Sequence, residues 1–268
     1  MSFLARLVFV LALLVSCFTA ARSSSSSSKR GLGVDWTQRT AFEQLHAAWY
    51  YDWGTHADPV IKTSNLPFTP MFWSTSCLYN PDTTRCGGPI DSSATAVLGF
   101  NEPDNQHQSN MNVTAALAAW PLLLKGASSC SSGSALIGSP ALAGNPVTDT
   151  WMPAFMATAG DTVNFTTLHW YKGANAELFI SDVKALVAAY GKPVWVTEFA
   201  AQDHATAEKH PFRYSWHEVG EFVKKVLTFM EGHAMVHRYA WHNAGVGSSA
   251  LFFENGTATP TGIVYGSV

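Results

Sequence analysis

Val97-Leu-Gly-Phe-Asn101-Glu102-Pro103-Asp104 and Pro193-Val-Trp-Val-Thr197-Glu198-Phe199 share one pattern, an apolar strand-like run that stops at a glutamate. A carboxylate that follows buried apolar residues is costly unless it is paired, hydrogen-bonded or functional. In barrels of parallel strands, the reacting groups lie at the carboxyl ends of the strands. The two stretches therefore predict that Glu102 and Glu198 meet at one end of a parallel sheet.

Eight strand-like segments are found by working outward from these two, which are the fourth and seventh in chain order. Helix-like stretches separate most of them, and strand-helix repeats predict an α/β fold, a single-domain (β/α)8 TIM barrel over residues 31–268. A doubly wound open sheet is the alternative, but no glycine-rich dinucleotide loop follows the first strand. The predicted strands are 31–36, 48–53, 68–73, 96–100, 135–139, 164–170, 194–198 and 238–242.

The best helix candidates carry recognisable end signals. Asn112 is a candidate N-cap for the first of them, and Tyr190-Gly191 a candidate C-terminus for the third. Weaker candidates lie at 40–46 and 58–63. The stronger candidates are 113–125, 149–159, 176–189 and 215–230.

The first thirty residues are typical of processing signals. Residues 7–15 form an apolar run too short to span a bilayer, and Thr19 and Ala21 fit a cleavage site, so residues 1–21 predict a signal peptide. A buried N-terminal helix is the alternative. Residues 22–30 form a serine-rich spacer. Its last two residues, Lys29-Arg30, indicate either a dibasic processing site or a solvated basic pair at the bottom of the barrel.

Three cysteines remain after Cys17 leaves with the signal: Cys77, Cys86 and Cys130. In an oxidising compartment one pair should bridge, and Cys77–Cys86 would close a short, turn-rich loop. The pairing itself stays open at this level. Three glycosylation sequons are compatible with secretion, and the C-terminus has no apolar tail of the kind that a lipid anchor needs. The sequons begin at Asn112, Asn164 and Asn255.

Composition limits the classes of partner that the protein is expected to bind. The formal net charge is −3 and becomes more negative when the N-terminal basic residues are removed, so a nucleic-acid partner is not expected. Ten tryptophans are many for this length and hint at carbohydrate, whose sugar rings stack on aromatic faces; a large core is the alternative. His233 and His237 lack the glutamate of a metalloprotease helix, so no catalytic metal is expected. No serine lies in a nucleophile elbow, so a serine hydrolase is not supported, and no cofactor is expected.

The two glutamates suit one reaction. A retaining glycosidase needs one carboxyl that is protonated and donates to the leaving oxygen, and one ionised carboxylate that attacks the sugar, roughly 5–5.5 Å apart. Strands four and seven lie nearly opposite in an eight-strand ring, so both side chains can enter one cleft. This hypothesis makes Glu102 the acid/base and Glu198 the nucleophile; the alternatives are an N-cap or ion-pair partner for Glu102 and an ion-pair partner for Glu198.

These motifs also carry a family resemblance. Gly99-Phe-Asn-Glu-Pro-Asp104 with Trp195-Val-Thr-Glu198-Phe resembles clan A glycoside hydrolases, whose Asn-Glu-Pro marks the acid/base and whose strand-seven glutamate is the nucleophile. Four further stretches are similar to glycoside hydrolase family 128, a family of fungal endo-β-1,3-glucanases and cell-wall glucan-binding proteins. The resemblance covers about residues 29 to 265. The four stretches are Lys29-Arg-Gly-Leu-Gly33, Pro70-Met-Phe-Trp73, Leu168-His-Trp-Tyr171 and Tyr239-Ala-Trp-His242.

The resemblance implies roles for further residues. Asn101 would hold a sugar hydroxyl, while His169 and Tyr171 would orient Glu198. Trp241 would be the stacking floor under the cleaved sugar. For the tryptophans core packing is the alternative, and His169 could be a satisfied buried histidine. Other sugar contacts would come from Trp53, Trp73 and Asn243.

The sequence thus predicts a secreted, monomeric, retaining endo-β-1,3-glucanase that acts by double displacement, located outside the cell or in the cell wall. Its partner would be a β-1,3-glucan polysaccharide or oligosaccharide, with no membrane contact after signal removal. A cell-wall glucan-binding protein and a glucan transglycosylase are the alternatives, since the same two carboxylates serve hydrolysis and transfer.

Overall fold

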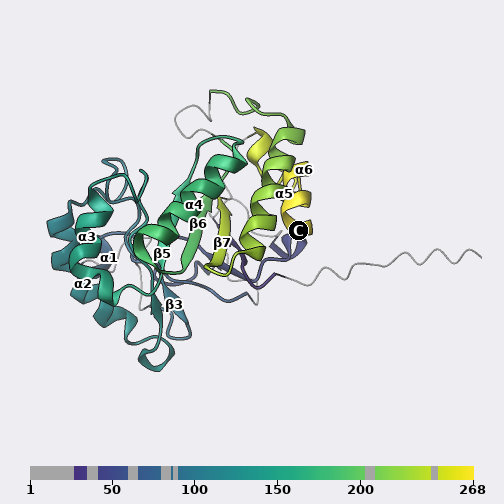
Figure 1. Ribbon diagram of the computed structural model, residues 1–268. Coiled ribbons are helices and arrows are strands. Elements are labelled where there is room, and N and C mark those ends of the chain that lie inside the picture. Colours follow the sequence, from purple (N-terminus) through teal and green to yellow (C-terminus); the bar gives the residue numbers. More distant parts are fainter. Residues whose placement is uncertain are drawn as a thin grey trace, which may run out of the picture.

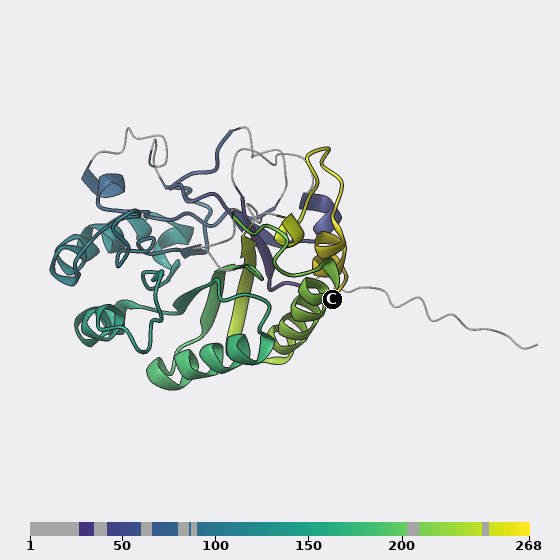
Figure 2. The ribbon, with the colours of Figure 1, turned by 90° about the horizontal axis from the view of Figure 1, so that it is seen from above.

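The computed structural model describes residues 27–34, 42–59, 66–79, 86, 90–202, 209–242 and 247–268. In this part of the chain, parallel strands form an inner layer that helices surround (Figures 1 and 2). One sheet has the order β2-β1-β7-β6-β5 and a second pairs β3 with β4. The strands are β1 (Arg30–Gly33), β2 (Trp49–Tyr51), β3 (Ala96–Val97), β4 (Leu136–Ile137), β5 (Thr166–Trp170), β6 (Val194–Phe199) and β7 (Val236–His242).

Isolated parallel bridges join the two sheets into a ring. Gly138 bridges to Phe165 between β4 and β5, and residues 68–71 bridge β2 to β3 through the pairs Tyr50–Phe68 and Met71–Leu98. The pairing path therefore returns to its starting strand, and the predicted barrel is confirmed. The third predicted strand, 68–73, contributes bridges instead of a ladder, because it follows Pro67 and contains Pro70, which lack the N–H that a ladder needs.

Large side chains fill the inside of the ring. Trp195 stacks on Phe165 with ring centroids 4.0 Å apart and also contacts Trp49. Gly31 makes room for this packing, because a Cβ there would lie 2.2 Å from the ring of Trp49. Residues that alternate with this set face outward and pack under the helices. The inner cluster is Trp49, Tyr51, Met71, Ala96, Leu98, Phe165, Trp195 and Ala240.

The four stronger helix predictions are confirmed to within a few residues. Asn112 caps α2 by accepting from the N–H of Ala115 at 2.8 Å, and Gly191 ends α4 with a left-handed φ of 61°. Of the weaker candidates, 40–46 gives only a short 3-10 turn, Phe42–Leu45, and 58–63 lies mostly outside the described residues. The helices are α1 (Ser76–Tyr79), α2 (Val113–Ala127), α3 (Trp151–Ala159), α4 (Ala176–Tyr190), α5 (Trp216–Gly232) and α6 (Pro260–Ser267).

The first and last segments of the described chain are joined by the basic pair. The Lys29 ammonium donates to carbonyls at the end of α5, including that of Met230 at 2.9 Å. Arg30 is only 1% exposed and donates to carbonyls of Leu45, Gly266 and Val268. The expectation of a solvated basic pair is therefore wrong for Arg30. Dibasic processing stays a prediction, and cleavage after Arg30 would remove these bonds from the fold.

Cysteine pairing and the search for membrane spans give two further results. Cys77 and Cys86 form a disulfide, which settles the pairing that the sequence left open, and Cys130 is free and buried. Among the described residues, none of the helices has the length and apolar character needed to cross a membrane. The predicted signal peptide lies outside the described residues.

Candidate active site

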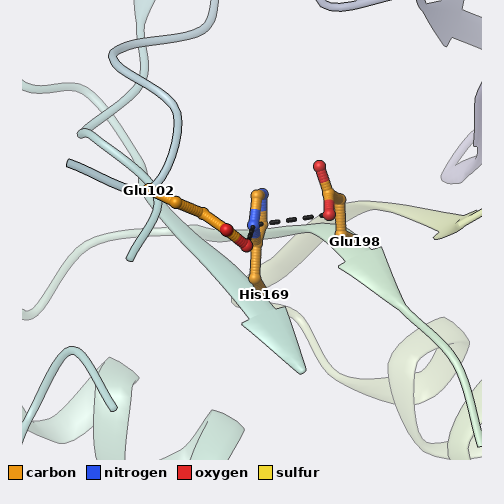
Figure 3. Close-up of side chains that lie close together, drawn as sticks. All are labelled: Glu102, His169 and Glu198. Carbon is orange, nitrogen blue, oxygen red and sulfur yellow. Dashed lines mark hydrogen bonds and ion pairs between the residues drawn. The ribbon is translucent and has the colours of Figure 1, made fainter. Parts of the chain in front are cut away.

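The two glutamates, far apart in the sequence, meet at the carboxyl ends of the strands. Glu102 follows β3 and Glu198 lies in β6, and both are buried, with 6% and 5% exposure. His169, from β5, lies between them (Figure 3). One nitrogen or oxygen atom from each of the three side chains lies within 4.8 Å of the others.

A β-bulge aims Glu198 into the barrel. Leu168 pairs with Val196 and the next residue, His169, pairs with Glu198, so Thr197 is an extra residue on β6. Val196 and Phe199 both face the outer core. If side chains alternated strictly from Val196 onward, Glu198 would face outward as well. A bulge re-aims side chains, and here it lets Glu198 face the site.

A left-handed turn presents Glu102. Its φ is +43°, a conformation that is unfavourable for a residue with a side chain. The Glu102 N–H donates to the carbonyl of Ala141 at 2.6 Å. Two residues on, the Asp104 carboxylate accepts the N–H groups of Ala143 and Gly144 at 2.9 and 2.8 Å. The loop after β4 thus holds the strained turn in place.

Both oxygens of Glu198 accept short hydrogen bonds. The Tyr171 hydroxyl donates to Oε2 and the Trp53 indole N–H donates to Oε1, each at 2.7 Å. Burial would raise the pKa of Glu198, but the charges of His169 and His242 and these two bonds outweigh burial and lower the pKa. Glu198 is therefore held ionised and in one orientation.

His169 contacts both carboxylates. Its Nδ1 lies 2.9 Å from Oε1 of Glu102 and 3.5 Å from Oε2 of Glu198. Burial lowers the pKa of this imidazole, but Glu198 and Glu102 together raise it by more, so the net shift of the pKa is upward. The two carboxylates thus favour the protonated form of His169.

These three side chains also converge as metal ligands could. Glu102, His169 and Glu198 each offer one ligand atom, and the site contains no other such group in the described residues. In the structure Nδ1 of His169 is already engaged in a hydrogen bond with Glu102 at 2.9 Å. The expectation that the protein uses no metal stays a prediction.

The other predicted sugar contacts are placed unequally. Asn101 is buried beside Glu102 and donates to Gln108 at 3.2 Å, and its Oδ1 has no hydrogen-bond partner among the described residues. Trp53 contacts Glu198 directly, with a left-handed φ of +63°. Trp73 is half-buried, and its carbonyl accepts the N–H of Asn101 at 3.0 Å. Asn243 lies outside the described residues.

The prediction that Trp241 is a stacking floor for sugar is wrong. Trp241 is fully buried, packs against Phe199 and donates its indole N–H to the carbonyl of Ser249. Side chains alternate across a strand. On β7 Ala240 faces the inside of the barrel, so Trp241 faces the helices and His242 faces the site.

Two residues of the site were missed in the sequence. The Tyr51 hydroxyl lies 3.3 Å from Oε1 of Glu198 and 2.8 Å from the carbonyl of Thr197. His242 packs edge-on against Trp53 and Tyr171. Counting in steps of two along β2 and β7 from known inward residues would have found both.

Comparisons with known proteins agree with this geometry. Residues 30–265 match the glycosyl hydrolase catalytic core family, and the chain belongs to that family. The class of protein is therefore glycoside hydrolase.

The chain is similar to solved structures of glycoside hydrolase family 128, as the sequence motifs indicated. An endo-β-1,3-glucanase of subgroup I from Amycolatopsis mediterranei, crystallised as a mutant with laminarihexaose, is 25% identical with a TM-score of 0.73 over 90% of this chain and 99% of its own. A curdlan-specific exo-β-1,3-glucanase of subgroup III from Blastomyces gilchristii is 28% identical with a TM-score of 0.69, over 91% and 100%.

A sequence relative is also known. Alkali-sensitive linkage protein 1 of Schizosaccharomyces pombe is 29% identical over 256 residues, which cover 90% of this chain and 45% of the relative. The chain thus spans about half the length of the curated relative that it matches.

Proposed function

We propose that this chain is a secreted, retaining endo-β-1,3-glucanase, with Glu198 as nucleophile and Glu102 as general acid/base. The observation that carries the proposal is the meeting of two buried carboxylates within 4.8 Å at one end of the strands. Inverting glycosidases hold their carboxyls about 6.5–9.5 Å apart to leave room for a water, and retaining ones about 5–5.5 Å. One oxygen of each carboxylate lies within 4.8 Å of the other, which fits the shorter spacing of retaining enzymes better than the longer spacing of inverting ones.

In the first step, the Glu102 carboxylic acid gives its proton to the glycosidic oxygen while an oxygen of Glu198 attacks the anomeric carbon. The bond to the leaving sugar breaks and a glycosyl ester forms on Glu198. Trp53 and Tyr171 hold Glu198 in position for this attack. As Glu102 becomes negative, the charge of His169, 2.9 Å away, stabilises it.

In the second step, Glu102 takes a proton from water, and the resulting hydroxyl oxygen attacks the anomeric carbon of the ester. Glu198 leaves as a carboxylate, so the sugar is released with its original configuration and both residues return to their first state. Asn101, with its unpaired Oδ1, is placed to accept a bond from a sugar hydroxyl next to the reacting carbon.

The substrate class is proposed from the similar structures, which are named as β-1,3-glucanases. Half-buried Trp73 and Trp53 offer aromatic surface at the same end of the strands for neighbouring sugars. Secretion is supported by the N-terminal sequence pattern and the disulfide, which is typical of an oxidising compartment.

Two alternatives share the same site. A glucan-binding protein would hold the polymer without cleaving it, but both carboxylates and the donors to Glu198 favour turnover. A transglycosylase would use a second glucan in place of water. The same geometry supports both hydrolysis and transfer.

The test is incubation of the secreted protein with laminarin and defined β-1,3-oligosaccharides. Shorter products with the β-anomer formed first, measured by proton NMR, are expected. Longer products would mean transfer, and bound but unchanged sugar would mean a binding protein. Initial α-anomer would contradict retention, and cleavage only at chain ends would contradict endo action.

The variant Glu198→Gln should lose nearly all turnover and keep affinity for laminarihexaose, measured by calorimetry. Glu221→Gln, an exposed glutamate on α5, is the matched control and should behave as the wild type. Near wild-type turnover by Glu198→Gln would remove this residue from the nucleophile role.

A further inference from the structure

His242, the last residue of β7, faces the site and contacts both groups that bind Glu198. Its ring lies 5.7 Å from the ring of Trp53 and 5.6 Å from that of Tyr171, with interplanar angles of 68° and 85°. Edge-to-face contacts of this kind fix the orientation of both rings. One residue therefore supports both donors to the proposed nucleophile.

Trp53 also packs against the ring of Tyr51, with ring centroids 5.1 Å apart, and His242 is a further ring in contact with it. Trp53 lies in a turn with positive φ. The neighbouring Asp52 accepts from the N–H groups of Gly54 and Asp58. These bonds stabilise the backbone of the turn and do not involve the indole ring. Tyr171 follows the end of β5, beyond its ladder. The His242 ring contacts both side chains and so links the positions of Trp53 and Tyr171 at the mouth of the barrel.

We propose that His242 is a positioning residue for the reaction: it fixes Trp53 and Tyr171, and through them the carboxylate of Glu198. The inference rests on the proposed function. It assigns His242 no contact with the reacting carbon. Glu198 is 5% exposed and its two oxygens are already bonded, so a small rotation of either donor would tilt the attacking lone pair.

The charge of the imidazole adds a second effect. After burial, which acts in the opposite direction, the charges of His169 and then His242 are the largest influences on the pKa of Glu198, and both lower it. The other titratable groups that face Glu198 are Tyr51, Tyr171 and Glu102. Removing His242 should thus move the acid limb of the pH profile of kcat/KM upward, because its charge and the two bonds that it positions all lower the pKa of Glu198.

The test compares His242→Ala and His242→Phe with His237→Ala, the matched control on the exposed face of β7. For laminarihexaose, His242→Ala should lower kcat by about 10–100-fold with KM little changed, as expected when catalytic groups shift by about 1 Å. His242→Phe keeps a ring and should recover part of kcat, yet its acid limb should lie at higher pH, as in His242→Ala. His237→Ala should match the wild type.

The outcomes separate this inference from the proposed function. If the wild type and His237→Ala cleave laminarihexaose, and the His242 variants match them or lose turnover with an unmoved acid limb, His242 is not a positioning residue. If the wild type does not cleave at all, the proposed function fails and this inference falls with it. Thermal melting checks that each variant folds, and His242→Asn replaces His242→Ala if that variant does not.

Discussion

Glu198, in β6, and Glu102, which follows β3, face the same site, but the surrounding residues hold the two side chains differently. Glu198 accepts 2.7 Å bonds on both oxygens from Tyr171 and Trp53. Among the residues that the structure describes, Glu102 has His169 at 2.9 Å and otherwise a 3.4 Å contact with Asn105. A nucleophile must stay ionised and aimed, whereas an acid/base must gain and lose a proton in each cycle. The fixed carboxylate and the looser one fit these two roles.

The clearest test of this difference between the two glutamates is to remove each carboxylate in turn. Glu198→Ala and Glu102→Ala should each lose more than about 100-fold in turnover, as expected for groups that act in proton transfer or covalent catalysis. Added azide should enter the vacated space. With Glu198→Ala and an activated β-aryl substrate it should give an α-azide by direct displacement, and with Glu102→Ala and the same substrate a β-azide by way of the ester.

Formation of the glycosyl ester is the control. Glu102→Ala should keep rapid ester formation with a good leaving group, because that group needs no proton, whereas Glu198→Ala should lose it with any β-linked substrate. A burst of released aryl alcohol, followed at millisecond times, measures this step. A burst from Glu198→Ala and none from Glu102→Ala would reverse the two roles.

Next in size is the loss of one hydrogen bond at each carboxylate. Tyr171→Phe removes a bond to an ionised group, worth about 1.5–3 kcal/mol, so kcat should fall by about 10–100-fold. Asn105→Ala removes the 3.4 Å contact to Glu102, along with an exposed bond from the His107 N–H, and should change kcat by less than about threefold. Steady-state kinetics on laminarihexaose, with exposed Tyr79→Phe as control, measures the difference. Equal effects would mean that the two carboxylates are held alike.

A smaller effect concerns His169, which lies between the two regions. Its pKa is raised in the folded protein, so its ion pairs stabilise the fold fully below the ordinary value of 6.5 and this stability is lost as pH rises through the folded pKa. The difference in unfolding free energy between the wild type and His169→Gln should therefore shrink as pH rises above that value. Urea titrations across this range measure it, with exposed His107→Gln as control. A difference that grows with pH would contradict a charged His169.

The smallest expected effect is that of a chelator. If a protonated His169 joins the two carboxylates, dialysis against EDTA should leave kcat unchanged, and added Zn²⁺ should not raise it. Elemental analysis of the purified protein checks the same point. Loss of activity with EDTA, restored by one equivalent of metal, would show that the three side chains hold an ion instead.

Sequence patterns predicted the barrel and the pair of glutamates because both depend on local signals, apolar runs and residues that follow them. Trp241 was misplaced because the choice between neighbouring residues on β7 depends on which face is inward, and a single sequence gives no fixed starting point for the alternation. Tyr51 and His242 were missed for the same reason. The bulge at Thr197 changes the alternation on β6 and is set by pairing with β5 and β7, which the sequence of β6 alone does not contain.

Arg30 contacts the carbonyl of Val268, so β1 and the end of α6 lie side by side at the floor of the barrel, opposite the mouth that holds Glu102 and Glu198. An affinity tag, a crystallisation partner or an extra polypeptide fused at either point would project away from the sugar. Joining the two points by a short linker and opening the ring elsewhere is a practical route to a permuted enzyme. Immobilisation through either end would leave the mouth free to meet an insoluble polymer.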